Sequence, residues 1–132
     1  MKKLLIIAII IICSLNTSNA QSISKTWMLV QFQDFKKEEF VALKAQMDFT
    51  NLEQPNAKMG CNTIGFQVKI KKNKIKFSKI FRTMMFCENM MFIETAFSDA
   101  IKSVKTYKLD DHKLTLFYDK NETMVFIAQD WD

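Results

Sequence analysis

Apolar and polar side chains alternate along much of the chain, and an alternation of period two is typical of a β-strand with one buried face. Seven segments are predicted to be strands from alternating or clustered apolar residues: 27–32, 43–49, 66–70, 75–77, 107–109, 114–118 and 123–128. The segment 66–77 is a predicted hairpin that turns at Lys72-Asn73, with one apolar face and one lysine-rich face. Residues 51–57, which include Pro55, are predicted to be a loop.

The hydrophobic period changes between Glu88 and Val104, where apolar residues recur at steps of three and four. This spacing predicts an amphipathic helix with a broad apolar stripe. Short links between strands, with one helix inserted late in the chain, favour an α+β fold in which an antiparallel sheet packs on a single helix. A length of 132 residues leaves room for one domain.

The start of the chain has the features of a secretory signal peptide. A basic tripeptide precedes an unbroken apolar run of ten residues, and small residues before Gln21 fit a cleavage site. Such a run is too short to span a bilayer, which needs about 20 apolar residues. We therefore predict a signal peptide at residues 1–20 and a mature domain at residues 21–132, exported to the periplasm, the cell envelope or the medium. Lipid attachment at Cys13 is the less favoured alternative, because the large Ile12 precedes it.

Cleavage would leave 112 residues and lower the formal charge from +5 to +3, since Lys2 and Lys3 are removed. Of the three cysteines, Cys13 leaves with the signal peptide, so Cys61–Cys87 is the only possible intramolecular disulfide of an exported chain. Two separate free thiols are the alternative. The ordinary apolar content excludes collagen-like, disordered and multi-span membrane proteins.

A set of short motifs occurs in the order found in META/HslJ domains, and the resemblance extends over residues 26–128. The motifs are Trp27-x-Leu29, Gly60-Cys61-Asn62, Thr83-x-Met85-x-Cys87, Glu94-x-x-Phe97, Tyr107-x-Leu109 and Leu114-x-Leu116. The chain departs from the family pattern at Ile64, where an aromatic residue is usual, and at Gly65, which comes one residue early. Phe86 replaces the common alanine before the second cysteine.

The resemblance implies a compact antiparallel sheet, strongly curved or barrel-like, that wraps on one helix. It also implies a cell-envelope or secreted location and a link to heat-shock or stress responses, motility and antibiotic tolerance. The two cysteine positions carry over as a disulfide. The family has no established catalytic residues, so the resemblance assigns none here.

The residue types needed for catalysis or metal binding are sparse. His112 is the only histidine and sits in a polar turn, where a solvated side chain is the favoured interpretation. No carboxylate pair lies in an apolar run that would tune one of them for acid–base work. Methionines flank Cys87 and could bind Cu(I) through sulfur, but adaptable packing explains them better. We predict a protein that is not an enzyme, with no metal or cofactor.

Lysines are concentrated on the polar face of the predicted hairpin. They are Lys69, Lys71, Lys72, Lys74 and Lys76. Such a face could contact an anionic lipid or an acidic polymer, or could be a solvated surface that protects the sheet from edge-to-edge aggregation. Nucleic acid is an unlikely partner, because the chain is expected to be exported and no stacking aromatic residues interleave with these lysines.

Two functions fit these observations. The first is a non-catalytic exported domain, monomeric, that acts in envelope stress tolerance by binding through its surface. The second is an inhibitor or partner-binding module for a secreted or envelope protein, such as a protease or a secretion apparatus. The sequence does not identify the protein partner or envelope component.

Overall fold

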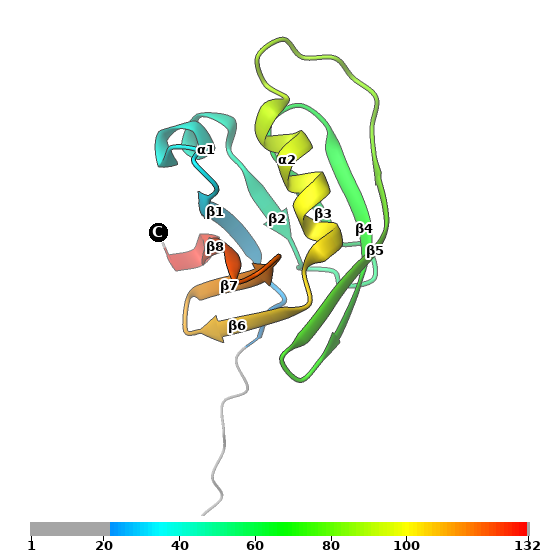
Figure 1. The fold of residues 1–132 in the computed structure, drawn as a ribbon, viewed down its shortest axis with the longest axis vertical. Coiled ribbons are helices and arrows are strands. Elements are labelled where there is room, and N and C mark those ends of the chain that lie inside the picture. The colour runs from blue at the N-terminus through cyan, green and yellow to red at the C-terminus, as the bar shows by residue number, and fades with distance from the viewer. Residues whose placement is uncertain (1–21, 132) are drawn as a thin grey trace, which may run out of the picture.

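The computed structural model describes residues 22–131, so the predicted signal peptide and Cys13 lie outside the described part of the chain. Eight antiparallel strands follow one another in sequence order around a closed barrel (Figure 1). They are β1 (Thr26–Phe32), β2 (Gln46–Asp48), β3 (Asn56–Lys58), β4 (Thr63–Lys71), β5 (Lys74–Arg82), β6 (Thr106–Asp110), β7 (Lys113–Tyr118) and β8 (Glu122–Ala128). The barrel closes where β8 pairs with β1. The predicted α+β fold, a barrel-like antiparallel sheet with one late amphipathic helix, is confirmed.

The late helix, α2 (Phe92–Ala100), continues into a single 3-10 turn, η1 (Ile101–Ser103). Its apolar stripe is buried against the sheet through Ile93, Phe97 and Ile101. The chain inserts this helix between β5 and β6, which share only the register pair Lys74 and Thr106. The helix is thus inserted in the chain between the two neighbouring strands that share the fewest paired residues.

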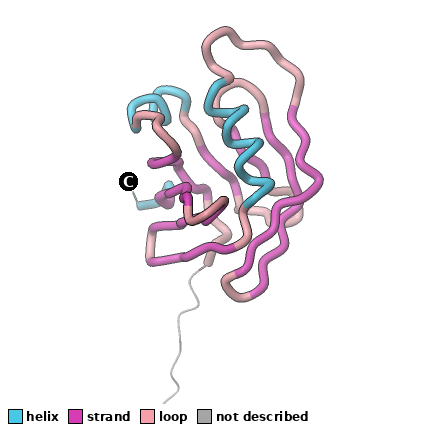
Figure 2. The backbone as a smooth tube through the Cα atoms, in the orientation of Figure 1, coloured by secondary structure: helices cyan, strands magenta, loops and turns pink. Residues whose placement is uncertain are grey.

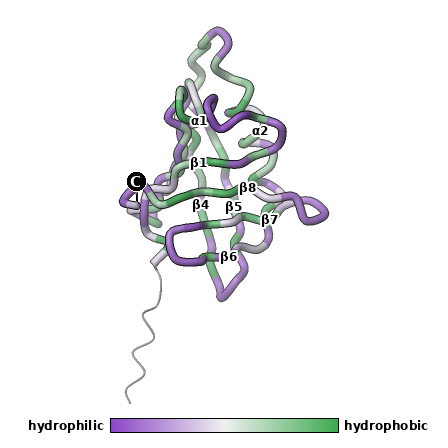
Figure 3. The backbone as a smooth tube through the Cα atoms, turned by 90° about the vertical axis from the view of Figure 1, so that its left-hand side faces the viewer, coloured by the Kyte–Doolittle hydropathy of each residue, from purple (hydrophilic) through white to green (hydrophobic). Residues whose placement is uncertain are grey.

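The core is built from the inward-facing positions of the strands. Trp27 is fully buried, and its indole Nε1 donates to the carbonyl oxygen of Ile23 at 2.8 Å, which satisfies the one polar atom that it brings inside. Phe49, Phe66 and Phe77 pack together with ring centroids 5.1 to 6.3 Å apart. The hydropathy colouring of Figure 3 shows hydrophobic stretches along the strands and mainly hydrophilic turns, as the alternation requires.

Three local predictions are corrected by the structure. The predicted strand 43–49 is shorter than expected: only Gln46–Asp48 form β2, and Leu43 ends a short helix, α1 (Lys37–Leu43). The backbone of this helix is capped because Lys36 N–H donates to Glu39 Oε2 at 2.7 Å. Only Phe40 of this helix is buried, so no helical stripe is visible in the sequence. Strand β3 begins inside the predicted loop 51–57, and its three residues are too few to show an alternation.

The late helix also starts four residues after the predicted Glu88. Asn89 adopts a positive φ of 59°, a left-handed conformation that a continuous right-handed helix cannot contain. The segment between β5 and α2 is therefore a long loop, drawn in pink at the top of Figure 2. Within residues 22–131, no helix has the length and apolar character needed to cross a membrane.

Candidate functional site

The long loop between β5 and α2 is fixed at its base by a buried side-chain amide. Asn62 is 1% exposed, and its Oδ1 accepts from Met85 N–H at 2.7 Å and from the Thr83 hydroxyl at 2.9 Å. Its Nδ2 donates to the Met85 carbonyl at 3.0 Å and to Glu94 Oε2 at 2.9 Å. A carboxamide has two donor hydrogens and two acceptor lone pairs, so all four bonding positions of Asn62 are used. The amide pairs with the Met85 backbone much as a neighbouring strand would.

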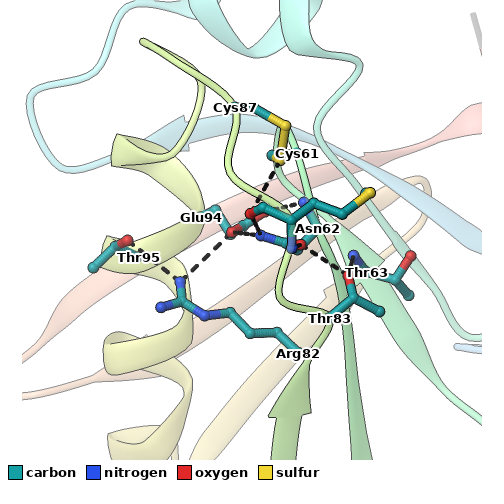
Figure 4. A network of polar contacts seen from close by, with 9 residues as sticks. Cys61, Asn62, Thr63, Arg82, Thr83, Cys87, Glu94 and Thr95 are labelled. Carbon is teal, nitrogen blue, oxygen red and sulfur yellow. Dashed lines mark hydrogen bonds and ion pairs between the residues drawn. A yellow bond between two sulfur atoms is a disulfide. The ribbon is translucent and has the colours of Figure 1, made fainter.

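A fully buried carboxylate completes this arrangement from the helix side. Glu94 lies in the first turn of α2 and is 0% exposed. Its Oε1 accepts from the backbone N–H of Asn62, and its Oε2 lies 3.6 Å from Nη1 of Arg82 at the end of β5. Arg82 also donates to the Thr95 hydroxyl at 3.4 Å (Figure 4). A buried charge persists only when it is paired and hydrogen-bonded, and Glu94 meets both conditions.

We call the side chains of Asn62, Arg82, Thr83 and Glu94 the polar clamp. It joins three segments that are distant in sequence: the turn before β4, the end of β5 and the start of α2 (Figure 4). Both oxygens of Glu94 are engaged, and its side chain has no solvent contact. These contacts suit a structural joint and leave the carboxylate no access to a substrate from solvent.

A covalent bond lies beside the polar clamp. The structure joins Cys61 and Cys87 in a disulfide, with Cα atoms 5.8 Å apart. Cys61 Sγ also lies 3.7 Å from the Met85 carbonyl oxygen, but this is a contact without a hydrogen bond, because a disulfide sulfur carries no hydrogen. The predicted pairing of these cysteines is thus present in the structure.

A glycine allows the part of the loop next to α2 to pack closely against the turn before β4. Gly60 has a φ of 146°, and a Cβ at this position would collide with the backbone carbonyl of Met90. Only glycine permits both this backbone conformation and this approach. The loop is therefore held at Met85, Cys87 and Met90.

We call residues 83–91 the apolar loop, because its anchored backbone displays large apolar side chains to solvent. Met84 is 93% exposed, Phe86 85% and Met85 57%, and Phe92 follows at 70% on the first residue of α2. Single exposed apolar residues are ordinary on protein surfaces, but here Met84, Met85 and Phe86 follow one another directly. The methionines that were considered, and not favoured, as Cu(I) ligands lie on this loop, and Cys87 has no thiolate to bind a metal.

The lysine-rich face predicted from the sequence is present on the β4–β5 hairpin. Lys69 pairs across the strands with Lys76, and Lys71 pairs with Lys74. All four side chains are exposed, and Lys72 occupies the turn with a positive φ of 56°. We call residues 69–76 the lysine hairpin. Figure 1 places its turn at the bottom of the molecule, at the opposite end of the β4–β5 ribbon from the apolar loop.

His112 lies in the turn between β6 and β7, as predicted, but its ring is not freely solvated. It stacks on Trp131 with ring centroids 3.7 Å apart, and Nε2 lies 3.2 Å from Asp111 Oδ1. This contact packs Trp131, close to the end of the chain, on the β6–β7 turn. In the described part of the chain, no group of three or more His, Cys, Asp or Glu side chains is arranged to hold a metal ion.

Sequence reasoning gave no role to the two central residues of the polar clamp. Asn62 entered only as part of a family motif, and its partners come from segments more than twenty residues away. The burial of Glu94, in contrast, could be inferred from the hydrophobic pattern of the helix. Glu94 precedes Phe97 by three positions and Ile101 by seven, so it stands on the apolar stripe of the helix. A carboxylate at such a position requires a buried partner.

Comparison with known proteins identifies the fold. A family model described as META domain matches residues 20–131. No curated protein matches the chain. An NMR structure of a protein from Burkholderia xenovorans superposes with a TM-score of 0.63 and 18% sequence identity, covering 80% of this chain and 82% of that one. A second NMR structure gives 0.58 and 15%, covering 82% of this chain and 92% of the other. At these identities the two structures support the fold alone.

Proposed function

The chain belongs to the META domain family, and on that premise we propose that it is an exported, non-catalytic binding domain that supports the cell envelope under stress. The proposal assigns partner binding to the apolar loop. The observation that carries it is the combination of exposed Met84, Phe86 and Phe92 with a loop base fixed by the disulfide and the polar clamp.

An anchored loop suits binding for an energetic reason. Ordering the backbone of a flexible segment on binding costs about 1–2 kcal/mol for each residue, and a backbone that is already fixed avoids much of this cost. Methionine adapts to irregular apolar surfaces, and aromatic residues contribute a large share of interface energy. Met84, Met85 and Phe86 therefore provide the side chains expected of a site that accepts an apolar protein surface.

Several observations support an exported, non-catalytic role. The Cys61–Cys87 disulfide fits an oxidising compartment outside the cytoplasm. The META domain is not a known family of enzymes. Glu94 is sealed from solvent, and the His112 ring is covered on one side by Trp131. A protease or a secretion component is the narrower alternative for the partner.

The lysine hairpin supports a second contact, with an anionic lipid or acidic polymer of the envelope. Like charges directly opposite each other across strands are destabilising, and the hairpin has two such pairs, Lys69 with Lys76 and Lys71 with Lys74. An anionic surface would relieve this repulsion. Because the hairpin turn and the apolar loop lie at opposite ends of the ribbon, a protein seated on such a surface would still present the apolar loop to a partner (Figure 1).

The test is affinity capture from an envelope extract with the exported protein, followed by a Kd measurement on the purified partner. The Met84→Ser/Phe86→Ser double variant is expected to bind at least about tenfold more weakly, because truncation of a central interface side chain costs about 1–2 kcal/mol or more. Leu52→Ser is the matched control, since Leu52 is an exposed apolar residue outside the apolar loop. Equal affinity of the wild type and the double variant would refute the assignment to the loop.

A further inference from the structure

A groove of about 920 Å³ runs over the outer face of β2, β3, β4 and β5. Its centre is a row of four residues paired in register across these strands: Asp48 with Asn56, Asn56 with Gly65, and Gly65 with Phe81. The volume falls within the range of about 300–1,000 Å³ that is usual for small-molecule sites.

Phe81 forms an aromatic platform at one end of this row. Its side chain points outward, is 67% exposed and lies over Gly65, where a Cβ would collide with the edge of the ring. The glycine that departs from the family spacing thus makes room for an aromatic ring on the surface of the sheet. A ring that is exposed to this extent is available to stack on a ligand.

Apart from Phe81, Pro55, Gly65 and Phe66, the groove is lined by polar and charged side chains, and the charges balance. Side-chain amides of Gln46, Gln54, Asn56 and Gln67 line it, and among residues 22–131 they have no hydrogen bond to another protein group. Asp48 and Glu53 are offset by Lys58 and Lys79, which also line the groove. The lining therefore offers many neutral donors and acceptors without a net charge that would select an ion.

We propose that this groove binds a neutral oligosaccharide. A pyranose ring has a face of C–H groups, which stacks on the negative face of an aromatic ring such as Phe81. Its hydroxyls are both donors and acceptors, which matches carboxamides such as Asn56 and carboxylates such as Asp48. Both hydrogen bonds to Asp48, from the N–H and hydroxyl of Thr50, use Oδ1.

Other ligand classes fit the groove less well. An extended peptide is commonly bound by adding a strand to an open sheet edge, but β2, β3, β4 and β5 are each paired on both sides in the closed barrel. A polyanion would select the lysine hairpin, which is cationic, over a groove whose charges balance. A purely apolar ligand would leave the amides without partners.

The experiment titrates cellotetraose, maltotetraose and chitotetraose into the isotopically labelled exported protein and follows the side-chain amide signals of Asn56 and Gln67 by NMR. At least one oligosaccharide is expected to shift these signals with a Kd of about 1 mM or tighter. Phe81→Ala is expected to weaken this binding at least about tenfold, a loss of about 1.4 kcal/mol. Phe86→Ala, an exposed phenylalanine on the apolar loop, is the matched control and is expected to leave it unchanged.

A second variant tests the platform without removing the ring. Gly65→Ala is expected to displace Phe81 and to weaken oligosaccharide binding, while the barrel stays folded because the side chain that must move is on the surface. Absence of binding of all three sugars up to about 10 mM would overturn the proposal. So would full affinity of Phe81→Ala, or binding of extended tetrapeptides to the same amides in place of sugars. None of these outcomes depends on a partner at the apolar loop, so the two proposals can fail separately.

Discussion

The β4–β5 ribbon ends in the apolar loop at one end and in the lysine hairpin at the other (Figure 1). The apolar loop is held by a disulfide, a buried amide and a buried carboxylate, and it exposes methionine and phenylalanine. The lysine hairpin is held by cross-strand backbone pairing, and it exposes lysines set against each other. The contrast shows two ways to build a surface: one depends on a backbone fixed by specific contacts, and the other depends on the charge of its side chains.

This difference has a physical origin. An apolar surface releases free energy only when it is covered, and a tight fit requires a backbone of defined shape. A charged surface acts over about 8 Å at physiological ionic strength and tolerates movement of each side chain. The rigid end is therefore suited to a shaped protein partner, and the charged end to an extended anionic surface.

The largest expected effect concerns the polar clamp. Asn62→Ala removes one donor to the buried carboxylate of Glu94 and leaves polar groups of Thr83 and Met85 without their partner. Glu94 keeps Arg82 and the backbone N–H of residue 62, so the cost comes from the lost hydrogen bonds. A buried polar group left without its partner costs about 1–3 kcal/mol, and the expected total is about 3–4 kcal/mol of unfolding free energy. Urea unfolding with an unchanged m-value would measure it.

The matched control for this substitution lies at the other end of the ribbon. Asn73→Ala makes the same chemical change in the exposed turn of the lysine hairpin, where the expected loss is within about 0.5 kcal/mol. Equal losses for the two asparagines would show that the two ends do not differ in how they are held.

The second effect concerns the disulfide, which closes a sequence separation of 26 residues. The Cys61→Ala/Cys87→Ala variant is expected to lose about 3 kcal/mol of stability, since a cross-link of this size restricts the unfolded chain by roughly that amount. Proteolysis in the apolar loop should accelerate as well, while the lysine hairpin should keep its protection. Adding reductant should reproduce the loss in the wild type and change nothing in the variant. Two labelled thiols in an untreated chain of residues 21–132 would contradict the bond.

The hydrophobic pattern was sufficient to predict most of the barrel for a clear reason. Positions such as Phe66, Ile75 and Leu114 report burial directly, because strands with one covered face must alternate. Elements without a patterned buried face were missed: α1 buries only Phe40, and β3 only Ala57.

The candidate sites were also predictable only where the local pattern determines which side chains lie together. The lysines were predictable because a hairpin fixes which side chains share a face. The role of Asn62 was not, because its partners Thr83, Met85 and Glu94 meet only in the folded chain. Exposure of Phe86 was equally hidden, since composition does not distinguish a surface aromatic residue from a core one.

The third effect concerns the lysine hairpin and is smaller. One substitution there should raise the stability and weaken the binding to anionic vesicles. Lys76→Glu replaces a repulsive cross-strand pair with an attractive one opposite Lys69, so stability should rise by about 0.2–1 kcal/mol. Binding to anionic phosphatidylglycerol vesicles at low salt should weaken, because each basic residue near such a surface contributes about 1 kcal/mol. Lys37→Glu on α1 is the control with the same charge change and should retain more vesicle binding. Unchanged binding of Lys76→Glu would remove the lysine hairpin as an anionic contact.

The smallest expected change in stability belongs to the apolar loop itself. Met84→Ser/Phe86→Ser should shift the unfolding free energy by no more than about 0.5 kcal/mol, because both side chains are already in solvent and contribute little to the core. Phe97→Ser makes the phenylalanine change at a fully buried site and should cost about 3–5 kcal/mol. Thermal and urea unfolding of the two variants would separate an exposed binding surface from a packed one. A loss in the double variant close to that of Phe97→Ser would mean that Met84 and Phe86 stabilise the fold, and the anchored end would then be explained without any partner.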